Sequence, residues 1–307
     1  MDTAIVFAGT PANAAETLQA LVQQGFRVVL AVTRTDAPVG RNKIMTASPV
    51  AEMAQRLGIP VLKTNRPTES DLATIAASGA RLGVVVAYGC ILIKTALETL
   101  EQGWFNLHYS LLPRWRGAAP VQRAIMAGDR ETGVTLFKLD EGMDTGPIVG
   151  TVKTVIEPTE TAGELLRRLT TLGCTLLSEA LPSVQSGLSI PTEQTGEASL
   201  ASKISRNEAR IDWAATARTI EHQIRGCNPE PGAWTMLDGQ PFKIHEAIAI
   251  ADPSASEAVG ALVVQGDRVM VSTGAGLLLL KTVQPASKRA MSAGDWVRGV
   301  GQGLRFD

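Results

Sequence analysis

Short β-branched runs alternate with helix-like segments over the first 156 residues, and this alternation limits the fold more than any other feature. The runs are TAIVFA, FRVVLAVT, LGVVVAY, WFNLH and GVTLFKL, and the helix-like segments among them include ANAAETLQALVQQG and PVAEMAQRLG. Such alternation predicts a mostly parallel, Rossmann-like sheet with helices on both faces. The stretches VVVA and RVVLAV support this, because strands buried on both faces are continuous in apolar residues. The first part of the chain is therefore predicted to have an α/β fold.

The pattern changes after residue 187. A long helix from about Thr161 to Leu181 closes the first part, and the residues after it are rich in Gly, Pro, Ser and Thr, as linkers are. One helix, with Asp212 as its N-cap, then precedes apolar runs divided by LDGQ, VQGDR and TGAG, which indicate hairpins. We predict a first, catalytic domain over 1–187, a linker over 188–203, and a C-terminal OB-like small β-barrel over 204–307.

Composition excludes several classes of protein and site. No window reaches the roughly 18 uninterrupted apolar residues of a membrane helix, and the start MDTAIVF lacks the basic region of a secretory signal. The three cysteines and three histidines do not have the spacing of a metal site or a disulfide framework. With a net charge of −1, nucleic acid can be bound only through local basic patches. We expect a cytoplasmic monomer with no metal and no membrane contact.

The turn after the first strand, FAGTPANAAE, does not match the common nucleotide-binding motifs. Only Gly9 fits the G-x-G-x-x-G pattern of dinucleotide-binding proteins, and no G-x-x-x-x-G-K-[ST] loop occurs. A nicotinamide cofactor is therefore not expected.

Polar side chains stand at the end of the predicted strand WFNLH. Asn106 and His108 are two residues apart, so they project from the same face of that strand. Pro113 lacks a backbone donor and disfavours helix at the residue before it, so the strand is expected to end near His108. Ligands of open α/β sheets bind at the carboxyl ends of strands. Left alone, a histidine there is more often structural.

A second element at the same sheet edge favours a functional role. The segment LDEGMDTGP follows the strand GVTLFKL, and its Asp144 is placed to reach His108. A carboxylate beside an imidazole favours the charged ring and fixes its tautomer. Asn106, His108 and Asp144 would then supply an oxyanion donor, a proton carrier and an orienting group. Ser110 has no base partner other than His108, so direct acyl transfer to an amine fits better than a covalent intermediate.

These residues carry a resemblance to a known family. Asn106-x-His108 followed by SLLPRWRGAAP, with LDEGMDTGPI about thirty residues on, resembles the catalytic core of the folate-dependent formyltransferases. FAGTP, GRNK with SPV after it, AYG, KISRNEARIDW, NPEPGAW and VQPASKRAM are similar to the methionyl-tRNA formyltransferases within that superfamily. The resemblance spans nearly the whole chain. Asn13, Asn42, Ile44 and Ile93 depart from the family pattern, Asn13 standing where a bulky aromatic residue is usual.

The resemblance implies an activity and a set of site residues. It implies transfer of the formyl group of 10-formyltetrahydrofolate to the amino group of initiator methionyl-tRNA. Asn106 and protonated His108 would stabilise the oxyanion, and Asp144 would hold the ring. The implied folate-binding residues are Ala87, Tyr88, Gly89, Ser110, Leu111, Leu112, Pro113, Leu139, Asp140 and Glu141. The implied tRNA-binding residues are Arg41, Asn42, Lys43, Lys203, Arg206, Lys288 and Arg289.

Two other functions remain open at this point. A sugar-amine N-formyltransferase acting on a nucleotide sugar would share Asn106, His108 and Asp144, although the GRNK loop and KISRNEARIDW argue against it. A tRNA-binding protein with an inactive site would fit the basic clusters, but it has no need of the intact trio. Net charge does not decide, since residues 203–307 hold 12 basic and 11 acidic side chains. Trp213 and Trp234 are expected to be buried rather than stacked on bases.

Overall fold

The computed structural model describes residues 4–40, 42–251, 257–300 and 303–307, and the chain divides into two compact units. The first unit gathers Met1–Pro120, Glu131–Val155 and Leu166–Ala201. The second gathers Val121–Arg130, Ile156–Leu165 and Ser202–Asp307. Two short segments from the middle part of the chain thus group with its C-terminal part. Among the described residues, none of the helices is long and apolar enough to cross a membrane.

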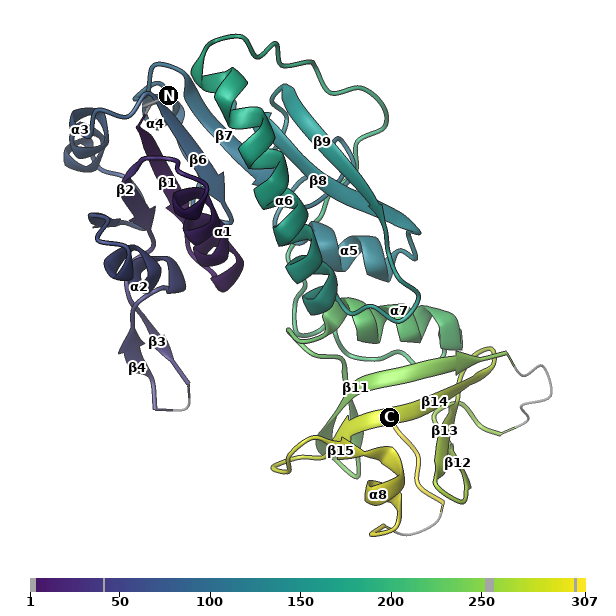
Figure 1. Ribbon diagram of the computed structural model, residues 1–307. Coiled ribbons are helices and arrows are strands. Elements are labelled where there is room, and N and C mark those ends of the chain that lie inside the picture. The colour runs from purple at the N-terminus through teal and green to yellow at the C-terminus, as the bar shows by residue number, and fades with distance from the viewer. Residues whose placement is uncertain (1–3, 41, 252–256, 301–302) are drawn as a thin grey trace. The chain divides into compact units, whose positions relative to one another are not determined.

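The first unit is built on a seven-stranded sheet in the order β5-β2-β1-β6-β7-β8-β9 (Figure 1). The strands are β1 (Ile5–Gly9), β2 (Val28–Thr33), β5 (Val61–Lys63), β6 (Leu82–Val86), β7 (Gly103–His108), β8 (Glu131–Lys138) and β9 (Ile148–Val155). Pairing is parallel from β5 to β7 and antiparallel from β7 to β9. The predicted α/β class with a mostly parallel sheet is confirmed.

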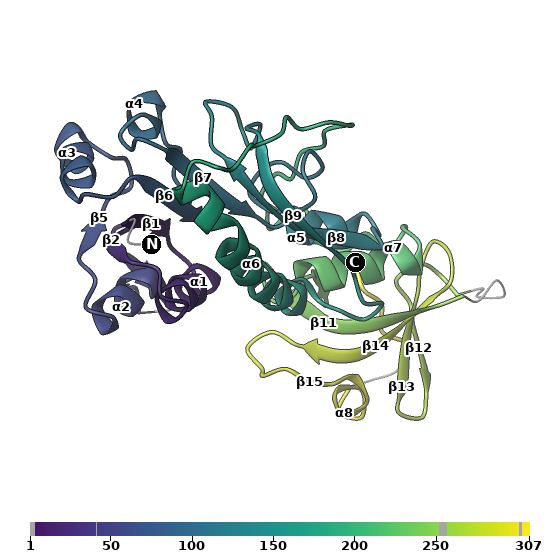
Figure 2. The ribbon, with the colours of Figure 1, turned by 45° about the horizontal axis from the view of Figure 1, so that its top comes forward.

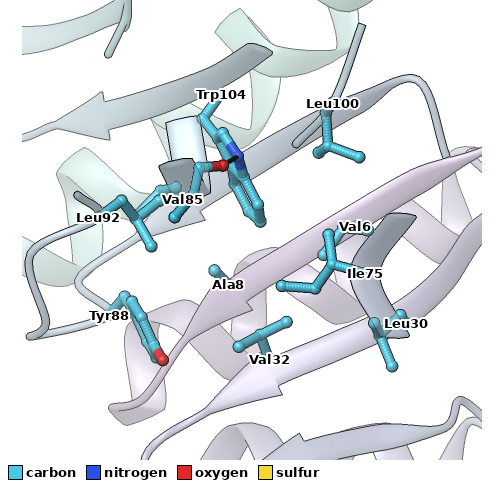
Figure 3. Packing of buried hydrophobic residues seen from close by; sticks show 11 residues of the cluster. Val6, Ala8, Leu30, Val32, Ile75, Val85, Tyr88, Leu92, Leu100 and Trp104 are labelled. Atoms are coloured by element: carbon cyan, nitrogen blue, oxygen red, sulfur yellow. Dashed lines mark hydrogen bonds between the residues drawn. The ribbon is translucent and has the colours of Figure 1, made fainter. Parts of the chain in front are cut away.

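Helices cover both faces of this sheet, as predicted. They are α1 (Ala12–Gln23), α2 (Pro49–Arg56), α3 (Glu69–Ala77), α4 (Lys94–Leu97) and α6 (Ala162–Gln185). The short helix α5 (Pro120–Met126) groups with the second unit. On one face Val6 and Val85 pack in a buried cluster with Ile75 of α3 and Ala96 of α4 (Figure 3). On the other face a Cβ added to Gly173 of α6 would lie 2.5 Å from Leu107, so α6 packs closely on β7. Figure 2 shows α1 and α6 along this second face.

The start of β7 is fixed by buried neighbours. Trp104 is 1% exposed and donates from its indole nitrogen to the carbonyl of Ala96 at 2.8 Å. Gly83 of β6 lies directly beside that ring, because an added Cβ would be 2.1 Å from Trp104. Strand alternation then places Asn106 and His108 on the same face as Trp104, nearer the carboxyl end. The sequence-based expectation for these two residues is confirmed.

Two details of the first unit differ from the sequence-based expectation or add to it. The long helix α6 ends at Gln185, four residues beyond the expected end at Leu181, and it includes Pro182. A two-stranded hairpin, β3 (Ala37–Val39) with β4 (Ile44–Thr46), extends beyond α2 (Figure 1). Its strands flank the GRNK segment.

The second unit holds an antiparallel sheet in the order β10-β11-β14-β13-β12, with β15 paired to β14. Its elements are α7 (Ala217–Cys227), β10 (Trp234–Leu237), β11 (Gln240–Ile250), β12 (Leu262–Gln265), β13 (Arg268–Ser272), β14 (Leu277–Gln284), β15 (Met291–Ser292) and α8 (Ala293–Val297). The LDGQ, VQGDR and TGAG segments each join two antiparallel neighbours, as predicted. A C-terminal antiparallel β unit is confirmed.

The start of α7 and one tryptophan were wrongly predicted. The N-cap is Thr216, whose side chain accepts from Thr219 N at 3.1 Å, whereas Asp212 accepts from Ala214 N in a separate turn. Trp213 is buried at 4% exposure and stacks on Phe306 with ring centroids 5.2 Å apart. Trp234, in contrast, is only half-buried.

Candidate active site

His108 and Asp144 meet at the carboxyl end of β7. His108 is 5% exposed, and its Nδ1 lies 3.7 Å from Oδ2 of Asp144. Asp144 comes from the loop between β8 and β9, which returns past the strand end. The expectation that Asp144 reaches His108 is therefore confirmed.

The hydrogen bond at the other ring nitrogen fixes the tautomer of His108. Nε2 lies 2.8 Å from the carbonyl oxygen of Trp115, and a carbonyl only accepts, so Nε2 carries a hydrogen. Nδ1 is then the atom that gains or loses a proton. Burial lowers the pKa of His108 below its usual value, although the Asp144 carboxylate and the Trp115 carbonyl act in the opposite direction. A lowered pKa favours the neutral ring before the reaction begins, which leaves Nδ1 able to accept a proton.

Asn106 lies two residues before His108 on β7, and its side chain is on the same face of the strand. It pairs with Val85 of β6 and Phe137 of β8 in the sheet, and it is half-buried. Among the residues that the structure describes, none forms a hydrogen bond with its side-chain amide. The Phe137 ring also meets His108 edge-on at 6.4 Å. The amide is therefore available as a donor beside the imidazole.

Backbone groups hold the Asp144 carboxylate and its loop in place. Oδ2 accepts from the amide of Gly117 at 2.7 Å. Gly117 has φ +122°, and an added Cβ would lie 2.9 Å from the Ala201 carbonyl, so only glycine fits there. A Cβ on Gly146 would lie 1.8 Å from the Lys138 carbonyl, so glycine also lets the two ends of the loop meet.

The AYG segment presents backbone rather than side chains. Ala87 has φ +47° and Gly89 φ +80°, and both are exposed. Tyr88 between them is 1% exposed, and its hydroxyl donates to the Thr64 carbonyl at 2.8 Å. Figure 3 shows the ring in the apolar cluster. A ligand at this turn would meet the backbone of 87–89 and not the phenol.

The turn after β7 is buried and internally bonded. Ser110 is 0% exposed and donates to the Arg114 carbonyl at 2.6 Å, and its own carbonyl accepts from Thr135 at 2.7 Å. Leu112 and Pro113 are buried and Leu111 is half-buried. The Ser110 hydroxyl is thus occupied, which fits chemistry without a serine nucleophile.

The acids at the start of the Asp144 loop have local partners. Asp140 accepts from Gly142 N at 3.0 Å and from the Thr145 hydroxyl at 2.7 Å, so it shapes the turn. Glu141 forms an exposed ion pair with Lys94 at 3.6 Å. Leu139 packs against the apolar cluster that includes Trp104.

All but one of the residues named for tRNA are described by the structure, and those described lie at the surface. Arg41 falls outside the described residues, and Asn42 and Lys43 are exposed between β3 and β4. In the second unit, the residues named for tRNA are also exposed: Lys203, Arg206, Lys288 and Arg289. Arg206 and Arg210 lie over the half-buried Trp234 ring at 5.2 and 5.7 Å, so this ring contacts cationic side chains.

Several groups at the site were missed by sequence reasoning. The Trp115 carbonyl and the Gly117 amide are backbone groups, which no side-chain pattern reveals. Gln194 lies in a stretch whose composition is that of a linker, yet it bonds to the Asp144 loop. Asn13, which departs from the family pattern, donates a hydrogen bond to the Tyr109 hydroxyl at 3.0 Å.

Comparison with known proteins gives the same family. A model described as "Formyl transferase" matches residues 1–181, and one described as "Formyl transferase, C-terminal domain" matches residues 203–301. The solved N-formyltransferase from Helicobacter canadensis, in complex with folinic acid and dTDP-3-aminofucose, has a TM-score of 0.66 over 93% of this chain and 100% of that one. At 19% identity this likeness shows the shared fold alone.

Sequence relatives are much nearer. A methionyl-tRNA formyltransferase from Arthrobacter sp. (strain FB24) is 46% identical over 295 residues, or 96% of each chain. A methionyl-tRNA formyltransferase from Streptomyces coelicolor is 44% identical over 298 residues, again 96% of each chain. The chain therefore belongs to the formyl transferase family, among its methionyl-tRNA formyltransferases.

Proposed function

We propose that this enzyme transfers the formyl group of 10-formyltetrahydrofolate to the α-amino group of methionyl-initiator tRNA, giving N-formylmethionyl-tRNA for translation initiation. The observation that carries the proposal is the arrangement of Asn106, His108 and Asp144 at one strand end, in a chain related along 96% of its length to methionyl-tRNA formyltransferases. The same function places the enzyme in the cytoplasm, with charged tRNA.

The reaction forms one C–N bond and breaks another. The amine nitrogen attacks the formyl carbon, the formyl oxygen becomes an anion, and the bond to N10 of the folate then breaks. The half-buried Asn106 amide is an oxyanion donor that has no other partner among the described residues. The occupied Ser110 hydroxyl supports direct transfer without an acyl-enzyme.

His108 carries the proton between the two nitrogens. Burial lowers the pKa of His108, so Nδ1 is free to accept the proton that the attacking amine loses. The imidazolium then faces the Asp144 carboxylate, which stabilises it. Nδ1 returns the proton to N10 as the folate departs, so the balance of atoms closes without a metal or a further reactant.

The two substrates are assigned to different surfaces. We assign the formyl donor to the exposed backbone of Ala87 and Gly89, the turn after β7 and the start of the Asp144 loop. The family membership supports a folate-derived donor. We assign the tRNA to the exposed basic residues of the β3–β4 hairpin and of the second unit.

A single assay tests the proposal. The enzyme is given 10-formyltetrahydrofolate with methionyl-initiator tRNA, elongator methionyl-tRNA or a nucleotide-linked amino sugar, and release of tetrahydrofolate and N-formylation are followed. We expect turnover with initiator tRNA, weaker turnover with elongator tRNA and none with the sugar. Turnover with the sugar alone would assign the chain to sugar formylation. Binding of tRNA without turnover would mean an inactive site.

A further inference from the structure

Residues 192–201 contact the candidate active site, although their composition predicts a linker. Thr192 and Ile148 exchange two backbone hydrogen bonds of 2.7 and 2.8 Å. At the other end, the Trp115 amide donates to the Ser199 hydroxyl at 2.9 Å, and the Ala201 amide donates to the Arg116 carbonyl at 2.7 Å. All of these residues belong to the first unit. The segment is therefore pinned beside β9 at one end and beside the His108-contacting backbone at the other.

Gln194 lies between these two sets of hydrogen bonds, and both its amide oxygen and its amide nitrogen are hydrogen-bonded. Its Oε1 accepts from Nε and Nη2 of Arg116 at 3.1 and 2.7 Å. Its Nε2 donates to the carbonyls of Asp144 and Gly146, both at 2.8 Å. A guanidinium only donates and a carbonyl only accepts, so the orientation of the amide is determined. All four of its hydrogen-bonding positions are filled.

Gln194 connects the segment that contacts His108 with the loop that carries Asp144. Arg116 is flanked by Trp115, whose carbonyl accepts from His108, and by Gly117, whose amide donates to the Asp144 carboxylate. The amide nitrogen of Gln194 donates to the backbone carbonyl of Asp144. Asp144 has φ +52°, a conformation that L-residues seldom adopt unaided. Gln194 thus ties the strand-end segment to the loop that carries the carboxylate.

We propose that Gln194 is a positioning residue, which sets the distance between the Asp144 carboxylate and the His108 ring by joining Arg116 to the backbone of Asp144 and Gly146. The proposal rests on the proposed function, since it assigns Gln194 a part in the chemistry of that pair. Gln194 itself touches neither ring nor carboxylate and acts through the loop.

A purely structural glutamine would behave differently. It would stabilise the fold, and its loss would lower the melting temperature, but the influence of Asp144 on His108 would stay the same. Among the described residues, the other groups that contact the His108 ring are the Phe137 ring and the Trp115 carbonyl, and both are uncharged. The influence of Asp144 on His108 is therefore a direct measure of their separation.

A double-mutant cycle read by NMR measures that influence without any substrate. The chain has three histidines, so the ring signal of His108 is assigned by its loss in His108→Ala. In the wild type, Asp144→Asn should lower the pKa of His108, because the carboxylate favours the charged ring. In the Gln194→Met background, which keeps the side-chain length but removes all four hydrogen bonds, the same change should shift the pKa by about half as much or less.

The control is Thr195→Met, the same new side chain at the exposed neighbouring position. It should keep the full Asp144→Asn shift. Equal shifts in the wild-type and Gln194→Met backgrounds would overturn the positioning role, as would the absence of a shift in the wild type. A failed formylation assay with a reduced shift in Gln194→Met would count against the proposed function alone.

Steady-state kinetics gives a second readout. Gln194→Met should lower kcat about tenfold or more and leave the KM for the formyl donor within about twofold, since misplacement of the pair affects the chemical step. Gln194→Glu keeps the acceptor for Arg116 but has no N–H for the two carbonyls, so it should resemble Gln194→Met. If circular dichroism shows that Gln194→Met is unfolded, Gln194→Glu takes its place in the double-mutant cycle. A change confined to KM, or wild-type kinetics in Gln194→Glu, contradicts the proposal.

Discussion

Burial and charge act in opposite directions on the pKa of His108, and burial has the larger effect. The ring is 5% exposed, its Nε2–H is committed to the Trp115 carbonyl, and only Nδ1 is left to exchange a proton. A neutral ring with one free nitrogen suits a group that first accepts the amine proton. The position of Asp144 3.7 Å away then stabilises the charged ring only after that proton has arrived.

Loss of the imidazole should remove the proton carrier and leave the substrate surfaces in place. We expect His108→Ala to lower kcat about a hundredfold or more, the usual contribution of an acid-base group, with tRNA affinity within about twofold of wild type. Single-turnover formylation and a filter-binding titration measure the two quantities. A variant within about threefold of wild-type turnover would contradict the role of His108.

The lowered pKa of His108 also links folding stability to pH. The unfolded chain takes up a proton as pH falls through about 6.5, whereas the folded chain does so only at lower pH. Stability should therefore be fully present above about pH 6.5 and should fall as pH drops from there towards the folded pKa. Thermal unfolding between pH 5 and 8, compared for wild type and His108→Gln, measures this. Equal pH slopes would show that His108 does not contribute. His222, whose pKa is also lowered by burial, is present in both proteins.

At the level of elements, the sequence pattern located the strands well, as well as the strand β7 and the loop after β8 that form the candidate site. Parallel strands buried on both faces are continuous in apolar residues, so β1, β2 and β6 were visible. The approach of Asp144 to His108 was also predicted correctly, because strand ends collect at one sheet edge. The Gly117 amide and the Gln194 bridge were missed, because they depend on which distant segments the fold brings together.

The misplaced start of α7 shows a second limit. Asp212 and Thr216 are both good N-cap residues, and local sequence does not choose between them. Thr216→Ala should lower the free energy of unfolding by about 1 kcal/mol, because Thr219 N loses its acceptor. Thr216→Ser keeps the hydroxyl and should stay within a few tenths of a kcal/mol. Urea denaturation measures both, and similar values for the two variants would mean that the helix begins elsewhere.

The contact between β6 and β7 predicts a strong effect at a small residue. Gly83→Ala would place a Cβ 2.1 Å from the Trp104 ring, so the ring or the strand has to move. We expect a loss of stability of about 1–3 kcal/mol and a shifted tryptophan emission. Gly299→Ala is the matched control, since its Cβ would meet only the Trp296 carbonyl at 3.7 Å. Unchanged stability in Gly83→Ala would contradict the packing described for Trp104.

For the whole molecule, the charge distribution predicts how tRNA binding depends on salt. Lys203 and Lys288 are exposed in the second unit. Replacing each by Ala should reduce the slope of log affinity against log salt by about 0.9 per lost duplex phosphate contact. Lys153→Ala, which removes a lysine paired with Glu131 at 2.8 Å, is the control and should keep the slope. Slopes equal to wild type in all three variants would place the tRNA elsewhere.

The division of the chain into two units has a consequence for biosynthesis. The second unit needs Val121–Arg130 and Ile156–Leu165, which leave the ribosome long before Ser202–Asp307. Their partners come late: Arg123 pairs with Glu208 at 2.9 Å, and Gly163 donates to the Asn228 carbonyl at 3.0 Å.

A nascent chain that has reached residue 201 therefore holds every strand of the first sheet but leaves two segments waiting for residues not yet made. One of them is α5, whose Val121, Ala124 and Ile125 are at most 3% exposed in the finished protein. Such apolar surface, uncovered during translation, is what chaperones bind and what drives aggregation. A product truncated in the last third of the chain would thus have the strands of the first sheet but an exposed, aggregation-prone apolar surface on α5.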